Sequence, residues 1–428
     1  MDVAPAQPTQ HPRANYAVFV LILVAVFAYV DRVIISVLQE GIKRDLGLSD
    51  TQIGVLTGLG FGLFYVMFAF PVARLADMWV RKYVIALALG AWSLMTVGSG
   101  FAMGFAMLLL CRIGVAVGEA GSAPTTHALI SDYFPQHRRA TVLSIWGMTL
   151  SLGPMIGFGL GGLLHDHLGW RETFVLMGLA GALVVPLVLL TLPEPQRGVF
   201  DDKDAAPPPP VITALRTLWK LRSFRFLCIG TGLHALSLTT IHGWAASFYH
   251  RSYGLSMTEA GLYLAIMIGI GGGLGTVMGG MLGDRLGRKN MRWYMAIPAI
   301  ATTLTIPFAL LQFMPHTLTL SLAGGMGVAL LSQMYLGPVT GTAQSLVGSG
   351  MRAITSAVLV VVTAVIGMSC GPLITGVLSD HLREAHGADG LRYAIMFTLV
   401  ANVLSCICYI LAARFLPGDG ALAKAEGD

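Results

Sequence analysis

Charge is what this sequence has least of. Asp, Glu, Lys and Arg together make up 11% of its 428 residues, whereas hydrophobic residues make up 55%. Soluble globular proteins carry about 25% charged residues, because charge covers the surface that faces water. The shortage excludes a soluble cytosolic enzyme, and it also excludes a disordered or fibrous chain. A mean hydropathy of +0.72 indicates that most of the surface faces lipid instead.

Cysteine is also scarce, and its five residues lie inside apolar stretches: Cys111, Cys228, Cys370, Cys406 and Cys408. Their number is odd, and the sequence has neither a CxxC motif nor a His/Cys metal spacing, so we expect buried thiols rather than disulfides. We expect no metal and no cofactor. Residues 1–18 lack the charged start and cleavage site of a signal peptide, so the first apolar segment is predicted to remain as a span.

Long apolar runs are what the chain has in place of charge. A membrane-spanning helix needs about 20 apolar residues, and these runs are too continuous for the alternating strands of a membrane barrel. The sequence therefore predicts an all-α membrane protein with twelve spans, whose expected ranges are 16–38, 53–76, 83–103, 105–133, 140–163, 172–192, 223–249, 258–282, 292–313, 317–339, 353–378 and 391–415.

Positive charge is unevenly distributed among the connections between spans. If the N-terminus is cytoplasmic, most Lys and Arg residues fall in cytoplasmic loops, as the positive-inside rule requires. The opposite side receives only Lys43, Arg44, Arg171, Arg251, Arg383 and Arg392. We therefore expect a multi-pass protein of a bacterial inner membrane with both termini in the cytoplasm. Topology explains the net charge of +5, so no nucleic-acid partner is expected.

The longest polar interruption divides the chain into two halves of six spans each. Residues 193–222 contain an acidic patch and a run of prolines, which is typical of a stiff linker. Its second part mixes Leu and Trp with Arg and Lys, and either lies along the lipid surface or is solvated with basic anchors. We expect an N-terminal bundle over 1–192, a linker over 193–222 and a C-terminal bundle over 223–428.

The two halves repeat each other. The pattern G-x-x-x-D-R-x-G-R-K is complete at Gly280–Lys289 and recurs at Ala73–Lys82, where Ala73, Met78 and Val80 depart from it. GPMIG in the fifth span is echoed by GPLITG in the eleventh. In these motifs the chain resembles the major facilitator superfamily. The resemblance implies two pseudo-symmetric six-helix bundles around a cavity that opens alternately to each side.

A narrower resemblance rests on YVDR at Tyr29–Arg32, on the stretch Arg112–Pro135, on GWRETF at Gly169–Phe174 and on DLGLSDTQIGVLTG at Asp45–Gly58. These segments are similar to the Spinster-type branch of that superfamily. Its animal members export sphingosine-1-phosphate or lysophospholipids. The resemblance implies a lipid-like substrate for this chain.

Four ionisable residues lie in mid-span, all of them in the first half: Asp31, Arg32, Arg112 and Glu119. Such residues are costly in lipid and mark ion or substrate pathways. Helix geometry places Asp31 and Arg112 at similar depth, with Glu119 about 10 Å deeper. We expect Arg112 to pair with Asp31 or to reach toward Glu119. Arg32 and Arg112 are the expected partners of the acids and of an anionic substrate.

A carboxylate whose arginine partner moves away during transport can take up a proton on one side and release it on the other. Glu119, expected to lie farther from both arginines, is our first candidate for the proton carrier, and Asp31 is the second. The alternative is a fixed ion pair that only holds the bundle together, which is weak stabilisation after desolvation.

The repeated loop motif implies a cytoplasmic gate. In the family, the motif's Asp, here Asp77, approaches the N-terminus of the eleventh span, and its Arg, here Arg81, pairs with an acid that ends the fourth span, here Asp132. A carboxylate at a helix N-terminus is stabilised by the helix dipole. We expect Asp284, Arg285 and Arg288 to form a weaker second latch. The alternative is that these basic loops only fix topology.

Several polar residues of the second half are candidate cavity contacts: His234, His242, Gln333 and Tyr335. His234 and His242 are eight residues apart and share a helix face, so they could bind a phosphate or carboxylate. Packing inside the bundle is the alternative for each of them.

Together these features predict a monomeric, proton-coupled secondary transporter of an amphiphilic anion. Two alternatives remain open: a symporter or exporter of a small organic anion or drug, and a passive lipid facilitator or scramblase. A membrane enzyme is not expected, because the sequence has no HExxH, GxSxG or Walker motif.

Overall fold

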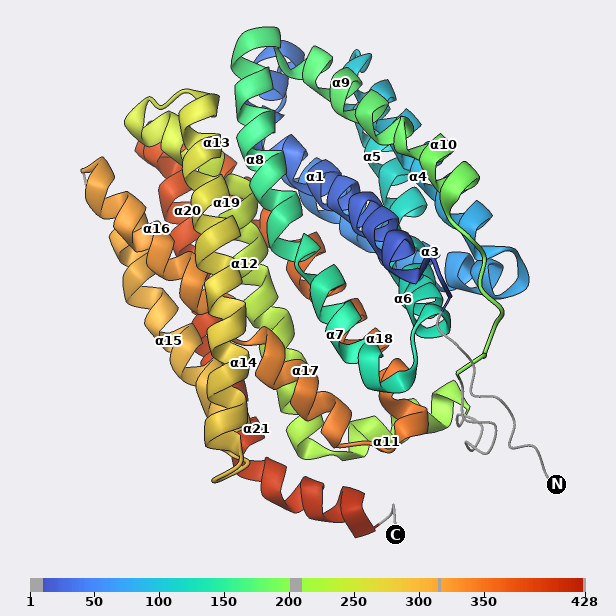
Figure 1. Ribbon diagram of the computed structural model, residues 1–428. Helices are drawn as coiled ribbons and strands as arrows, with labels where there is room; N and C mark the ends of the chain where they lie inside the picture. Colours follow the sequence, from blue (N-terminus) through green and yellow to red (C-terminus); the bar gives the residue numbers. More distant parts are fainter. Residues whose placement is uncertain (1–10, 201–209, 315–316, 426–428) are drawn as a thin grey trace, which may run out of the picture. The chain divides into compact units, whose positions relative to one another are not determined.

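The computed structural model describes residues 11–200, 210–314 and 317–425, and in this part of the chain every regular element is a helix (Figure 1). Residues 201–209 lie outside the described part, and with them the acidic patch and prolines 207–209 of the predicted linker. Residues 1–10, 315–316 and 426–428, which belong to the two predicted bundles, also lie outside it. All five cysteines are free thiols, and Cys111 and Cys228 are buried.

The α-helices of the first half are α1 (Ala14–Leu46), α2 (Asp50–Gly54), α3 (Gly60–Met78), α4 (Arg81–Gly100), α5 (Phe105–Glu119), α6 (Ser122–Tyr133), α7 (Gln136–Gly147), α8 (Thr149–Leu168), α9 (Trp170–Ala182) and α10 (Val184–Thr191). Those of the remainder are α11 (Val211–Lys220), α12 (Arg222–Tyr253), α13 (Met257–Ile266), α14 (Gly273–Gly287), α15 (Trp293–Phe313), α16 (Leu318–Ser332), α17 (Leu336–Ser345), α18 (Arg352–Val362), α19 (Gly371–His386), α20 (Gly390–Phe397) and α21 (Leu399–Ala425).

Short π-helical and 3₁₀ segments join several of these helices. The π segments are η1 (Val55–Leu59), η2 (Met267–Gly272) and η4 (Thr363–Cys370), and the 3₁₀ turns are η3 (Ser349–Met351) and η5 (Gly387–Asp389). Each π segment directly joins the α-helices on its two sides, so α2 to α3, α13 to α14 and α18 to α19 each form one continuous helix.

Eleven helical stretches of the described chain are long and apolar enough to cross a membrane. The last of them, Arg352–Gly420, has 69 residues and contains both the eleventh and the twelfth predicted spans. It turns at η5, where Gly387 has a φ of 58°. The prediction of an all-helical membrane protein with these spans is therefore confirmed.

Helix ends extend beyond the apolar runs on which the prediction was based. Lys43 and Arg44 were expected in a loop, but they lie in the last turn of α1, and Arg251 lies in the last turn of α12. Hydropathy marks only the part of a helix that lipid surrounds, whereas backbone hydrogen bonds carry the helix further into the polar region.

Contacts divide the chain into two compact units. The first holds 1–32, 64–153 and 171–205, and the second holds 33–63, 154–170 and 206–428. The second unit thus includes the end of α1, all of α2 and most of α8, although these segments belong to the first sequence half. Within the first unit α4 packs along α5, and within the second α15 packs along α16 and α12 along α21 (Figure 1).

Glycine brings α2 against α19 in the second unit. A Cβ on Gly376 would lie 2.3 Å from the main-chain oxygen of Asp50, and a Cβ on Gly54 would lie 2.6 Å from that of Pro372. Neither position can hold a side chain without moving the backbone of its neighbour. The repeated GPLITG motif therefore acts here as a close-packing surface, which positions the polar residues at the start of α2.

The helix α11 occupies the second part of the predicted linker. Ala214 and Leu218 are buried, whereas Ile212 and Trp219 are more than half exposed. Its contact with lipid stays a prediction.

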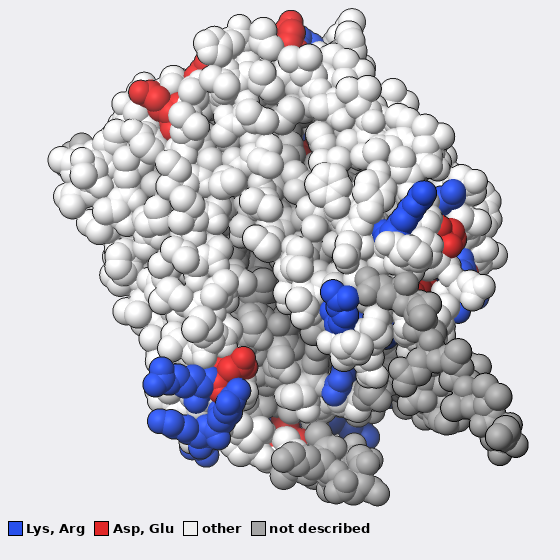
Figure 2. Space-filling view, in the orientation of Figure 1, with Lys and Arg blue, Asp and Glu red and all other residues white. Residues whose placement is uncertain are grey.

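Positive charge gathers at the end of α14, where Figure 2 shows a group of blue side chains beside a nearly uncharged surface. The exposed residues there are Arg285, Arg288, Lys289 and Arg292.

Candidate functional site

The four mid-span ionisable residues lie together in the first unit. Asp31 and Arg32 are on α1, and Arg112 and Glu119 are on α5. Asp31, Arg112 and Glu119 are 3%, 2% and 1% exposed. Arg32 Nε donates to Glu119 Oε2 at 2.6 Å. Two cations and two carboxylates thus share one polar cluster, which is buried except for part of the Arg32 side chain and which we call the charge quartet.

The pairing within the charge quartet differs from the expected one. Glu119 was expected to lie apart from both arginines, and this is wrong, because it forms an ion pair with Arg32. Arg112 Nη1 donates to the main-chain oxygen of Asp31 at 3.1 Å. Consecutive helical residues point about 100° apart, so Asp31 and Arg32 face different neighbours. Depth estimates from Cα positions also ignore the length of the arginine side chain, which reaches Glu119.

Two tyrosine rings lie close to the Arg32 guanidinium. Its carbon lies 5.0 Å from the ring centre of Tyr29 and 4.8 Å from that of Tyr65, within cation–π range. The Asp31 carboxylate faces Thr96 of α4. Sequence reasoning missed these three residues. Tyr29 stands in the YVDR motif and could have been found there, whereas Tyr65 and Thr96 come from other helices with no sequence signal.

Glu119 stands where its span is interrupted. It is the last residue of α5, and α6 begins again at Ser122. Its Oε1 atom is buried and has no hydrogen-bond partner among the described residues. Because Oε2 accepts from the Arg32 guanidinium and Oε1 accepts from no described residue, Oε1 is the oxygen on which a proton can bind. When one acid of the charge quartet is protonated, the arginines leave a net positive charge that attracts an anion.

The predicted gate residues are only partly brought together. Arg81 and Asp132 form a buried ion pair. Glu194 accepts hydrogen bonds from the backbone N–H groups of Arg81 and Lys82, at 3.1 Å each, and so caps the start of α4. Arg197 donates to the main-chain oxygens of Ala76, Asp77 and Trp79 at the end of α3. The first residues of the predicted linker therefore fold onto the loop motif, which sequence reasoning missed.

The remaining gate candidates are exposed. The side chain of Asp77 is exposed, and its expected partner at the start of the eleventh span belongs to the other unit, so that pairing stays a prediction. Asp284, Arg285 and Arg288 are also exposed and form no ion pair within the described part of the chain. Their role as a second latch likewise stays a prediction.

The polar candidates of the second half occupy two different environments. His234 Nε2 lies 2.8 Å from the main-chain oxygen of Ser332, Nδ1 lies 3.3 Å from Thr302 Oγ1, and the ring packs on Tyr335. This is the packing role that was the alternative for His234. His242 lines a narrow apolar cavity together with Gln312. Gln333 packs beside Gly272.

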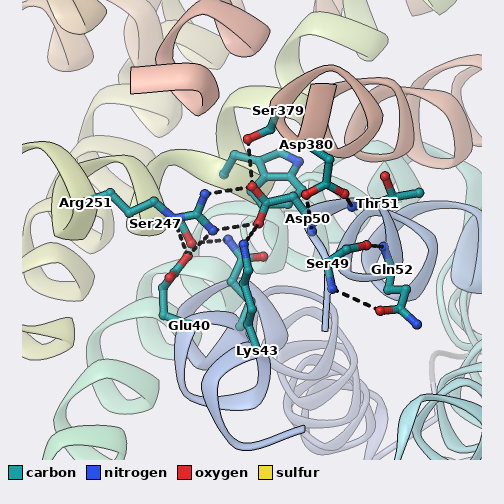
Figure 3. A network of polar contacts seen from close by, with 12 residues as sticks. Glu40, Lys43, Ser49, Asp50, Thr51, Gln52, Ser247, Arg251, Ser379 and Asp380 are labelled. Atoms are coloured by element: carbon teal, nitrogen blue, oxygen red, sulfur yellow. Dashed lines mark hydrogen bonds and ion pairs between the residues drawn. The ribbon is translucent and has the colours of Figure 1, made fainter. Parts of the chain in front are cut away.

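A second polar network, which sequence reasoning did not find, lies in the second unit (Figure 3). At its centre Asp50 accepts from both terminal nitrogens of Arg251, at 2.8 Å each, from Lys43 and from Ser379 Oγ at 2.7 Å. Arg251 also pairs with Glu40 at 2.7 Å. Asp380 accepts from the backbone N–H groups of Asp50 and Thr51.

One part of this network had a sequence signal. Ser49 and Gln52 form a capping box at the start of α2, and the S-x-x-Q spacing predicts such a box. The ion pairs had no signal, since their members come from α1, α2 and α12. Within residues 11–200, 210–314 and 317–425, no group of three His, Cys, Asp or Glu side chains is placed to hold a metal.

Comparison with known proteins gives the family context. The model of the Major Facilitator Superfamily matches residues 20–368. An "MFS-type efflux pump" of Mycolicibacterium smegmatis is 36% identical over 94% of this chain and 93% of its own length. The "Probable galactarate/D-glucarate transporter GudP" of Bacillus subtilis is 28% identical over 67% of this chain and 68% of its own.

Among solved structures, a bacterial homologue of the human lysosomal transporter Spinster, described as inward-facing and unoccupied, superimposes with a TM-score of 0.87. It is 28% identical and covers 96% of this chain and 99% of its own. The resemblance to the Spinster branch that the sequence motifs indicate is confirmed by this match.

Proposed function

Because the chain belongs to the major facilitator superfamily and is a transporter rather than an enzyme, we propose that it couples proton movement to the transport of an amphiphilic anion. The charge quartet carries this proposal. Its acids lie in mid-span in the first half of the chain, whereas the second half has no mid-span charge, so the charge quartet is the place in the membrane-spanning region where a transport cycle can load and release a proton.

The arginines of the charge quartet supply the anion affinity. Guanidinium groups bind phosphate and carboxylate with paired hydrogen bonds. An acyl chain would need an apolar surface, and the second half of the chain has no mid-span charge. This assignment favours a lysolipid or sphingolipid-like molecule, in keeping with the Spinster resemblance. We further propose that the protein acts in a bacterial inner membrane with both termini in the cytoplasm.

Transport in proteoliposomes tests the coupling. With a pH gradient imposed, fluorescent lysophosphatidic acid should cross the membrane faster than in protein-free vesicles, and a protonophore should abolish the difference. A rate that does not respond to the protonophore would identify a passive facilitator or scramblase instead.

A small organic anion is the second candidate, favoured by the galactarate/D-glucarate transporter among the relatives. A thermal-stability screen of the purified protein against lysolipids, sugar acids and aromatic acids separates the two. Stabilisation by short acids alone would replace the amphiphile with this second candidate.

Arg112→Ala tests the substrate assignment directly. Removing one partner of a buried charge pair costs about 2–5 kcal/mol, so the variant should bind anionic lysolipid more weakly by that amount and neutral lysolipid almost unchanged. Arg74→Ala, which removes an exposed arginine of α3, is the control and should bind both as wild type does. Equal binding of anionic lysolipid by Arg112→Ala and wild type would overturn the assignment.

A further inference from the structure

A cavity of about 580 Å³ lies in the second unit beside the network of Figure 3. The last turns of α1, α12 and α19 and the turn at η5 form its walls. Six charged side chains line it, namely Glu40, Lys43, Arg44, Asp50, Arg251 and Arg383. The cavity therefore offers a charged interior that is separate from the charge quartet, which belongs to the first unit.

Two of its cations are already neutralised. Arg251 meets Asp50 through two parallel N–H···O contacts of 2.8 Å and meets Glu40 at 2.7 Å. Lys43 completes the set by pairing with Asp50. The charges of these two cations and two carboxylates cancel, so this part of the cavity lining is neutral overall.

The other two cations have no such balance. Arg44 and Arg383 are exposed and form no ion pair or side-chain hydrogen bond with any residue that the structure describes. The acid next to Arg44 in the chain, Asp45, is turned toward Trp170, whose Nε1 donates to it at 3.1 Å. Glu384, which follows Arg383, is not among the lining residues. The lining thus carries two positive charges in excess.

We propose that this cavity is a second anion site, which takes a phosphate group between Arg44 and Arg383. Their guanidinium forks match the oxygens of a phosphate. The Asp50 carboxylate is buried and already binds both terminal nitrogens of Arg251. A phosphate that enters the cavity therefore competes with Asp50 for Arg251 and weakens the contact between α2 and α12. The proposal does not depend on which molecule the protein transports.

A phosphate group can come from inorganic phosphate or from a lipid headgroup, and two sets of nanodiscs distinguish these sources. In phosphatidylcholine nanodiscs, inorganic phosphate is titrated by calorimetry into the full-length protein. In phosphatidylglycerol nanodiscs, native mass spectrometry measures how many anionic lipids the protein retains. Saturable binding in the first set identifies free phosphate as a ligand, and retained lipid in the second identifies the headgroup.

Arg44→Gln/Arg383→Gln should lower phosphate affinity at least tenfold or reduce the retained phosphatidylglycerol. Lys289→Gln, which removes an exposed cation of the α14–α15 connection, should change neither. Asp50→Asn should raise phosphate affinity severalfold, because it removes the competing carboxylate.

The two arginines could instead only offset the negative ends of α1 and α19. In that case the double variant would unfold at lower temperature but match wild type in both nanodisc measurements, which would overturn the proposal. No transport is measured, so the outcome is separate from that of the proposed function.

Discussion

At the scale of single residues, the contact between Glu119 and Arg32 carries the proposed coupling. Glu119→Gln keeps the size of the side chain and an oxygen that can accept from Arg32 Nε, but it cannot ionise. We expect this variant to lose proton-driven accumulation while substrate counterflow continues, since counterflow needs binding and not proton release. Paired uptake and counterflow measurements in proteoliposomes check this.

Glu172→Gln is the matched control, because Glu172 is an exposed glutamate of α9 in the same unit. It should leave both rates unchanged. If Glu119→Gln keeps full, pH-dependent uptake, the proton is carried elsewhere, and Asp31 becomes the first candidate.

At the scale of elements, the first linker residues hold α3 and α4 in place. Glu194 caps α4 and Arg197 binds the end of α3. Loss of a helix cap costs about 0.5–2 kcal/mol, so Glu194→Ala should destabilise the first turn of α4 by that amount. Hydrogen exchange followed by mass spectrometry should show faster exchange in a peptide that covers residues 81–84.

A control for this effect is Glu172→Ala, which removes a glutamate from the first turn of α9, where it accepts no hydrogen bond from the described backbone. Exchange at residues 81–84 should then match wild type. Equal protection in Glu194→Ala would mean that the linker contacts do not contribute to the order of α4.

At the scale of the whole molecule, alternating access requires the end that carries the loop motif to open and close. We expect Asp77 to stabilise the closed form through the dipole of the eleventh span. Asp77→Asn should then raise the labelling rate of single cysteines placed at that end, measured with a membrane-impermeant maleimide. Asp284→Asn tests the weaker second latch in the same assay and should have the smaller effect.

Unchanged labelling in Asp77→Asn would mean that Asp77 does not stabilise the closed form. The motif would then only fix topology through its basic residues. A change in both variants of equal size would instead mean that the two copies of the motif act alike.

The sequence by itself determined the spans, the class of protein and the identity of the mid-span charges. Continuous apolar runs can satisfy their backbone polar groups in lipid only as helices, so hydropathy alone suffices to predict the spans. A mid-span charge is costly wherever it stands, so Asp31, Arg32, Arg112 and Glu119 are conspicuous without a structure.

Tertiary structure alone decided which of these charges meet. The pairing of Glu119 with Arg32 depends on how α1 and α5 are rotated about their axes, and an apolar sequence on all sides leaves that rotation open. The Asp50–Arg251 network joins residues about 200 positions apart, and the cap from Glu194 depends on where the linker folds back. Hydropathy measures what lipid surrounds, whereas these contacts depend on which helix faces are packed against each other.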